Sequence, residues 1–368
     1  MPAPYRPSGR RCGGHATLGA PAAAGGSYRE GREAVITVAD LGEFGLIAAI
    51  QALVPRGAAQ IVGIGDDAAV IRAPDARVVA STDLLVEGRH FRQDWSGPFD
   101  IGCKAAAQNL ADVVAMGARP TALLVGLAAP GDLPVRWAED FFRGLAEECA
   151  IAGASVAGGD VSAADSVMLA ITALGDLAGT DPVTRRGAHP GDLLAVAGML
   201  GSSAAGLALL AAGLASGAAD GGTSAPADQD LAGLVAAHRR PRPPYAAGPQ
   251  AAAAGATSMI DISDGLVQDL GHVAAASGVA IDIQQGRLAA GTVAAAGALR
   301  AAAAALGGQD WLAWVLSGGE DHALAATFPP GTFLPPGWSS IGTVGTGSGV
   351  QVDGRSRSDL DGWDHFRH

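Results

Sequence analysis

The sequence predicts two α+β domains, and three observations lead to this fold class. Short apolar runs typical of strands alternate with longer amphipathic or alanine-rich runs typical of helices. Several strands follow one another at hairpin-like spacing, which favours mixed sheets over a doubly wound parallel sheet. The chain has 368 residues and is 49% hydrophobic, which is enough for two domains with cores of their own.

The first domain is expected to span residues 37–181. Residues 1–36 are rich in Gly, Pro, Ala and Arg without any periodicity, so we expect a disordered tail. From about Asp40 the apolar pattern becomes regular. It predicts helices over 40–54, 99–116 and 134–152, and strands over 61–64, 69–71, 77–86, 123–127, 155–157 and 167–175.

The second domain is expected to span residues 182–368, because the composition shifts near 182–191 to a polar segment with two arginines. A loop is expected over 216–228, and the proline-rich stretch 239–244 reads as a stiff connector that ends a helix. The apolar pattern predicts helices over 201–214 and 266–276, and strands over 193–197, 259–262, 280–283, 324–328 and 340–344.

Composition excludes several classes of function. The net charge of −12 argues against nucleic acid as the main partner, but not against a nucleotide bound through metal ions. No strongly apolar run reaches about 18 residues, so no membrane span is expected. Three cysteines without metal spacing indicate a reducing compartment, and we expect a cytoplasmic protein. Lys104 is the only lysine and lies in no glycine-rich loop, which rules out a classical P-loop.

Aspartates placed beside glycines or at strand ends are the most informative motifs. They read GIGDD, STD, NLAD, GGD and IDISDG at 63–67, 81–83, 109–112, 158–160 and 260–265. Oxygen-rich clusters of this type bind hard divalent cations. Taken singly, each motif is explained more simply by a turn or a helix cap than by a function. If the carboxylates converge, bound metal must hold them together, since like charges about 4 Å apart repel by about 4 kcal/mol near a protein surface.

Spacing places some of these polar groups on common faces. Ser81 and Asp83 share one face of a strand. Lys104, Gln108 and Asp112 share one face of a helix with Asn109 at its border; that stripe is either a solvated face or the lining of a cleft.

Three acidic segments that contain glycine or serine are expected to form turns or a helix cap. Gly158-Gly159-Asp160 is expected to form a turn whose N–H groups cup phosphate oxygens. Ser263 or Asp264 is expected to cap the following helix. A second glycine-rich acidic turn, SGGED at 317–321, follows the apolar run 311–316.

The ordered motif string resembles the thiamine-monophosphate kinase family, in the superfamily of aminoimidazole ribonucleotide synthetase. The resemblance covers residues 38–368. It rests on GIGDDAAV, STDLLVEGRHF, NLADVVAMGARP, GGD, TRRGAHPGD, IDISDGLVQDLGH, SGGED and the terminal GWDHF.

This resemblance implies an aminoimidazole ribonucleotide synthetase-like fold. It implies a homodimer whose N-terminal domains pair their sheets into a shared barrel, a C-terminal α+β domain, and an active site in the cleft between the domains. The implied reaction transfers the γ-phosphoryl group of ATP to thiamine monophosphate, with Mg²⁺ as cofactor.

The resemblance also implies roles for individual residues. Asp160 and Asp264 are expected to act in catalysis. Arg185 is preferred over Arg186 from its place in the motif, and Trp363 suits stacking on a thiamine ring. The implied Mg²⁺ ligands are Asp67, Ser81, Thr82, Asp83, Asp112, Asp160, Asp261 and Asp264. The implied ATP contacts are Gly159, Asp160, Arg185 and Ser263, and the implied substrate contacts are His90, Glu320 and Trp363.

Rival functions make different demands on the sequence. A selenophosphate synthetase needs a reactive cysteine beside a lysine, and Cys12 has no such neighbour. A carbamoyl dehydratase of hydrogenase maturation ends in a cysteine, whereas this chain ends Phe-Arg-His. A rival from another class is a dimer that binds nucleotide or Ca²⁺ without catalysis, which release of ADP would separate from a kinase; no EF-hand loop supports the Ca²⁺ version.

Overall fold

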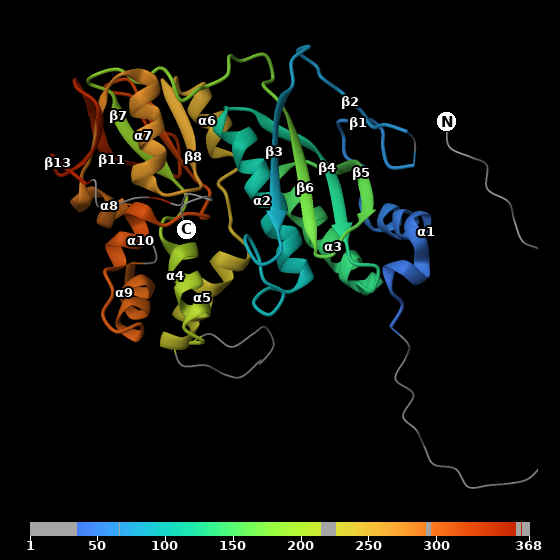
Figure 1. Ribbon diagram of the computed structural model, residues 1–368. Coiled ribbons are helices and arrows are strands. Elements are labelled where there is room, and N and C mark those ends of the chain that lie inside the picture. The colour runs from blue at the N-terminus through green and yellow to red at the C-terminus, as the bar shows by residue number, and fades with distance from the viewer. Residues whose placement is uncertain (1–34, 66, 215–225, 292–295, 358–361, 363–368) are drawn as a thin grey trace, which may run out of the picture. The chain divides into compact units, whose positions relative to one another are not determined.

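A computed structural model describes residues 35–65, 67–214, 226–291, 296–357 and 362. The described residues from Ile36 onward form one compact unit (Figure 1). The tail expected at 1–36 lies almost wholly outside the described residues, so its predicted disorder stays a prediction. Among the described helices, none is both long enough and apolar enough to cross a membrane.

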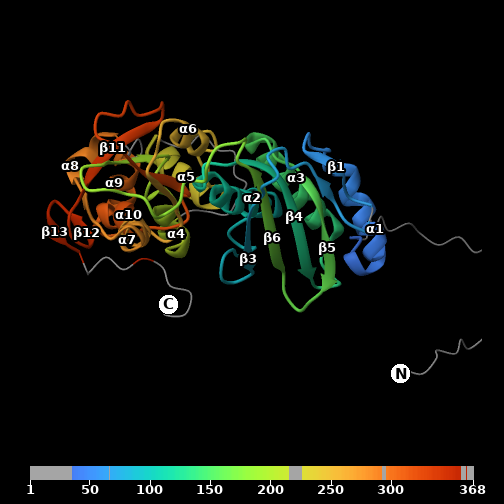
Figure 2. The same ribbon diagram turned by 90° about the horizontal axis from the view of Figure 1, so that it is seen from above.

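The first sheet has four strands in the order β3-β6-β4-β5. All neighbours are antiparallel except β4 and β5, which are parallel and joined by helix α3. Helices α2 and α3 lie on one side of this sheet (Figure 2). The elements are β3 Val79–Val86, α2 Pro98–Ala115, β4 Arg119–Ala129, α3 Val135–Ala152, β5 Val156–Ala163 and β6 Met168–Asp176.

Burial in this sheet alternates because only one face is covered. In β6 the side chains of Leu169, Ile171 and Ala173 are buried, and their neighbours are partly exposed. The buried set packs against α2 and α3 in one apolar cluster. A strand with one covered face shows this period of two, which is why the sequence pattern located β3 and β6 well.

Two small elements precede this sheet. Helix α1 (Val38–Leu53) begins with a capping box, in which Thr37 and Asp40 each accept a hydrogen bond from the other's backbone N–H. Its buried Leu46 and Ile50, one helical turn apart, join the core under the four-stranded sheet. Strands β1 (Gln60–Val62) and β2 (Val70–Ile71) pair antiparallel around the GIGDD segment.

The second sheet has seven strands in the order β13-β12-β9-β11-β7-β10-β8. The pairs are antiparallel except β12 with β9. The strands are β7 Leu193–Ala197, β8 Ser258–Ile262, β9 Ala280–Ile283, β10 Ala323–Phe328, β11 Trp338–Gly345, β12 Gly349–Val352 and β13 Arg355–Ser356.

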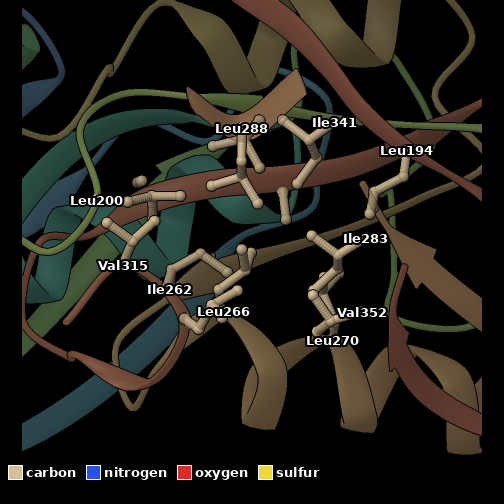
Figure 3. Close-up of a cluster of buried hydrophobic side chains, with 14 of the residues drawn as sticks. Leu194, Leu200, Ile262, Leu266, Leu270, Ile283, Leu288, Val315, Ile341 and Val352 are labelled. Atoms are coloured by element: carbon tan, nitrogen blue, oxygen red, sulfur yellow. The ribbon is translucent and has the colours of Figure 1, made fainter. Parts of the chain in front are cut away.

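Both faces of this sheet are covered at β10 and at the edge strand β8, in which every residue is buried. One face packs in the cluster drawn in Figure 3, which includes Ile262, Ile283 and Ile341. The other face contributes Met259 and Phe328 to a cluster that also holds Val114 at the end of α2. The second cluster therefore joins this sheet to the helix that covers the first one.

The remaining helices pack around the seven-stranded sheet and on one another. Helix α7 contacts β8, β9 and β12, and α4 contacts α5, α9 and α10. The predicted helices at 201–214 and 266–276 are confirmed as α4 and α7, and α10 occupies the run 311–316, for which no structure was predicted. The helices are α4 Ser202–Ala211, α5 Pro226–Arg239, α6 Ala247–Ala253, α7 Leu266–Ser277, α8 Gln285–Gly291, α9 Ala296–Ala305 and α10 Trp311–Ser317.

The turn expected at Gly158-Gly159-Asp160 is wrong. These residues lie inside β5, where Gly159 pairs with Val125 and Asp160 with Gly126 of β4. A Cβ on Gly159 would lie 1.9 Å from the carbonyl oxygen of Val125. The absence of a side chain thus permits close approach of two strands, a use of glycine that local sequence does not distinguish from a turn.

Candidate active site

A cleft of about 600 Å³ collects most of the predicted site residues. Its walls come from β3 and α2 on one side, and from β8 and two glycine-containing loops that adjoin the seven-stranded sheet on the other. The predicted residues that line it are Ser81, Asp83, His90, Asp112, Arg185, Asp261, Ser263, Asp264 and Glu320.

Hydrogen bonds between β3 and α2 build the first wall. Ser81 Oγ donates to Asp112 Oδ2 at 2.7 Å, and Gln108 Nε2 donates to Asp83 Oδ2 at 3.0 Å. The prediction that Ser81 and Asp83 share a face is confirmed, since both line the cleft. The polar stripe of α2 is therefore not a solvated face: Gln108 and Asp112 line the cleft, and Lys104 is buried beside it.

Asp261 is the central acid of the second wall. It lies in β8, is 5% exposed, and its Oδ2 accepts no hydrogen bond from the described residues. His322, also buried, places Nδ1 at 3.6 Å from that oxygen. A buried carboxylate oxygen without a hydrogen bond is unfavourable, so Asp261 Oδ2 is available to a further positive partner from the cleft.

The expected cap of α7 by Ser263 or Asp264 is wrong. Asp269, in the first turn, instead accepts hydrogen bonds from the backbone N–H groups of residues 263, 264 and 265, each at 3.1 Å. Helix α7 begins after Gly265 without a side-chain cap from Ser263 or Asp264. Because Asp269 satisfies these donors, the side chains of Ser263 and Asp264 line the cleft instead.

The SGGED loop is built directly against this segment. Glu320 N donates to Ser263 O at 2.8 Å, and a Cβ on Gly319 would lie 2.3 Å from the same oxygen. Glu320 and His322 have φ values of 65° and 53°, in the left-handed region. Such a conformation costs about 1–3 kcal/mol for a residue other than glycine and is found where surrounding structure imposes it, often at functional sites.

Negative charges crowd together at Asp112 and Asp261, whereas the charge of Glu320 is balanced by Lys104. Burial, and then the charge of Asp261, raise the pKa of Asp112 to about 7. Burial alone would raise the pKa of Glu320, but Lys104, His238 and His322 together outweigh burial and lower that pKa to about 2. Lys104 Nζ lies 2.8 Å from Glu320 Oε1. The aspartates therefore require a cation, whereas Glu320 already has one.

The donor set fits Mg²⁺ bound together with phosphate. The described residues contain no group of three His, Cys, Asp or Glu side chains arranged as a complete metal site. Mg²⁺ is commonly held by one or two carboxylates and by substrate phosphates rather than by an all-protein cage. The unbonded oxygen of Asp261 and the raised pKa of Asp112 mark positions where such an ion would relieve repulsion.

Four predicted residues within the described part of the chain do not line the cleft. Thr82 points to the opposite face of β3, where its Oγ1 donates to Ile171 O at 3.0 Å. Gly159 and Asp160 lie on β5, three strand spacings or roughly 14 Å across the sheet from β3. Asp67 is exposed in the segment between β1 and β2, and Trp363 lies outside the described residues. The roles of these residues stay predictions.

Two titratable residues that line the cleft, Arg89 and His322, were not among the predicted site residues. Arg89 precedes the predicted His90, and His322 follows the acidic SGGED turn by one residue, so proximity to each motif was an available signal. The link between Lys104 and Glu320 had no such signal, because 216 positions of sequence separate the two residues (320 minus 104).

A family model and a solved structure identify the fold of this protein. Residues 65–177 match the family described as AIR synthase related protein, N-terminal domain. The thiamine-monophosphate kinase structure from Stenotrophomonas maltophilia is similar, with a TM-score of 0.70, 32% identity, and coverage of 84% of this chain and 95% of that one. The protein thus has the fold of the AIR synthase-related class.

Closer relatives identify the family. The thiamine-monophosphate kinase of Mycobacterium tuberculosis H37Rv is 46% identical over 331 residues, covering 90% of this chain and 93% of that protein. A structure described as "AaThiL complexed with AMPPCP and TMP" covers 91% of this chain and 100% of that chain, with 32% identity and a TM-score of 0.69. The chain belongs to the thiamine-monophosphate kinase family.

Proposed function

We propose that this protein phosphorylates thiamine monophosphate with ATP, forming thiamine diphosphate and ADP. The observation that carries the proposal is the single cleft in which aspartates from β3, α2 and β8 meet Arg185 and Glu320. Family membership, at 46% identity over 90% of the chain, supplies the substrate class. A solved relative that holds AMPPCP and TMP supports the same pair of reactants.

The transfer is direct and in line. An ionised oxygen of the thiamine monophosphate phosphate attacks the γ-phosphorus of ATP, the bond from that phosphorus to the β,γ-bridging oxygen breaks, and ADP leaves. The attacking oxygen is already ionised, so the reaction needs no general base and no phosphoenzyme. The protein's contribution is to hold two polyanions close together and aligned.

Mg²⁺ fits this site, with Ser81, Asp83, Asp112, Asp261 and Asp264 as the cleft residues that would hold it. When bound, the metal neutralises charge on the phosphates of both reactants. Asp67, Thr82 and Asp160 remain proposed ligands, and Asp160 with Asp264 are the proposed catalytic pair. Asp160 lies on β5, at the opposite edge of the sheet from β3, so its proposed role as a ligand is the one that most needs a direct test.

Other side chains orient the reactants. Arg185 and Ser263 on the cleft wall are proposed to contact ATP, as is Gly159. His90 and Glu320 are proposed to contact the thiamine moiety, with Trp363 stacking on it. Val86 N donates to His90 Nδ1 at 3.0 Å, which fixes the plane of that imidazole ring at the cleft.

The protein is further proposed to be a cytoplasmic homodimer. The uncovered face of the four-stranded sheet carries Leu84 and Met168, 55% and 39% exposed. Such a face is suited to pairing with a second copy. We also propose that the two domains divide between residues 181 and 182. The first domain would bind nucleotide and metal and form the dimer, and the second would complete the cleft.

The test is an assay of ADP release in which phosphorylated thiamine and phosphorylated purine precursors are offered as acceptors. We expect Mg²⁺-dependent ADP release with thiamine monophosphate and formation of thiamine diphosphate in equal amount. Release with a purine precursor alone would replace the proposed acceptor. Binding of ATP without any ADP release would favour the non-catalytic alternative.

A further inference from the structure

Lys104 is a buried cation for which the transfer reaction has no direct use. Its side chain is 4% exposed in α2, and it is not among the residues that line the cleft. A buried ammonium group is unfavourable unless it is paired. Its Nζ lies 2.8 Å from Oε1 of Glu320, which is 32% exposed and does line the cleft. Lys104 therefore reaches the cleft through Glu320.

The second oxygen of Glu320 is also placed. Its Oε2 lies 3.4 Å from Nδ1 of His238, a buried residue of α5. Ser203 Oγ, at the start of α4, lies 3.1 Å from the same nitrogen. Burial, followed by the charge of Lys104, lowers the pKa of His238 to about 3. His238 lies against the second oxygen of Glu320 and helps to orient this carboxylate.

The backbone conformation of Glu320 also restricts where its side chain can lie. Its left-handed φ of 65° and the hydrogen bond from its N–H to Ser263 O set where the side chain leaves the loop. The carboxylate then spans the gap to α2, where Lys104 meets it. Two side chains contact the carboxylate and the backbone of Glu320 is fixed as well, which is more restraint than a surface glutamate receives.

We propose that Lys104 is a positioning residue that keeps the Glu320 carboxylate charged and turned toward the cleft. An anionic group held in this way repels phosphates and attracts a cationic or N–H-donating ring, so it sets affinity for the thiamine end of the acceptor rather than for ATP. The inference rests on the proposed function for the identity of that acceptor, but not for the bridge itself. The low pKa of Glu320, about 2, agrees with it.

Steady-state kinetics of Lys104→Met, Lys104→Arg, Glu320→Gln and the Met/Gln double variant test this role. We expect Lys104→Met to raise KM for thiamine monophosphate about 10- to 100-fold, the range for leaving a charged group without its partner. KM for ATP should stay near the wild-type value, and Lys104→Arg should recover part of the loss. The double variant should be no worse than its poorer parent, because the two residues act as a unit.

Two kinetic results would overturn the inference. One is an equal rise of both KM values in Lys104→Met, which indicates general damage to the structure. The other is multiplication of the two single effects in the double variant. Arg143→Met, on the exposed side of α3, removes a charge away from the cleft and is the matched control.

Because Lys104 is the only lysine, labelling lysine with ¹⁵N at Nζ gives one side-chain signal to follow by NMR. Glu320→Gln should shift this signal and Arg143→Met should not. Thiamine monophosphate should shift it in the wild type, whereas inorganic phosphate should not. An unchanged signal in Glu320→Gln would refute the bridge whether or not the variant turns over. Wild-type protein that releases no ADP with thiamine monophosphate would instead refute the proposed function.

Discussion

The two sheets of this protein differ in how many of their faces are covered. Every residue of β8 and β10 in the seven-stranded sheet is buried, because apolar clusters pack on both sides. In the four-stranded sheet burial alternates along β6, and the face opposite α2 and α3 carries exposed Leu84 and Met168. The first arrangement provides stability within one chain, and the second leaves a surface on which another molecule can pack.

The edge strands β8 and β5 of the two sheets differ in the same way in how far their acidic residues are buried. Asp261 of β8 lies in a covered sheet and needs a cation from the cleft, whereas Asp160 of β5 is exposed on an edge strand. Replacing a buried carboxylate is expected to change the free energy of unfolding as well as activity, whereas replacing an exposed one is expected to change activity alone. Four substitutions probe this contrast.

The largest expected effect on activity is that of Asp160→Asn. If Asp160 holds metal during transfer, turnover should fall by at least about 10- to 100-fold, the loss typical even of groups that only hydrogen-bond to a metal ligand. The melting temperature should not change, because the side chain is exposed. Ser162→Ala, two positions along the same strand, is the control. Wild-type turnover in Asp160→Asn would remove this residue from the proposed site.

The largest expected effect on stability is that of Phe328→Ala in β10. The ring is fully buried and packs edge-to-face on Trp338, with centroids 5.5 Å apart. Its loss should lower the free energy of unfolding by about 3–5 kcal/mol, measured by denaturant titration. Leu84→Ala on the uncovered face should change it by no more than about 0.5 kcal/mol in the monomer. Equal losses would contradict the difference between the two sheets.

Asp112→Asn should raise the metal-free stability near pH 7 by about 1–2 kcal/mol, because burial and Asp261 disfavour the charged form. The folded-state pKa of about 7 lies above the ordinary value of 3.8, so the wild type loses stability as the pH rises from about 4 to 7. The advantage of the variant should therefore shrink on acidification and also on addition of Mg²⁺. A constant difference between pH 4 and 7 would contradict the assignment.

The smallest expected effect on unfolding is that of Leu84→Glu, because the side chain is 55% exposed. Its effect on assembly should be large if the uncovered face pairs with a second copy, since the charge would be buried there. Light scattering after gel filtration should show a dimer for the wild type and a monomer for the variant. A wild-type monomer, or an unchanged dimer in the variant, would place assembly elsewhere.

Sequence periodicity located elements best where one face is covered. Burial in strand β6 alternates with a period of two, and helix α1 buries Leu46 and Ile50 one turn apart, because only one side of each element is covered. The pattern was weaker in the alanine-rich second half, where α6, α8 and α9 were not predicted. Glycines misled the assignment of β5, since close packing of strands and tight turns both favour glycine.

The sequence by itself determined the chemistry of this protein: aspartates beside glycines, one lysine, and an ordered motif string that resembles a kinase family. Local residue types decide such matters because they define which ligands the side chains can bind. Only the tertiary structure decided that Asp83, Asp112 and Asp261 share a cleft while Asp160 lies across a sheet, and that Lys104 meets Glu320. Those distances depend on strand order and on contacts between remote segments, which local patterns do not encode.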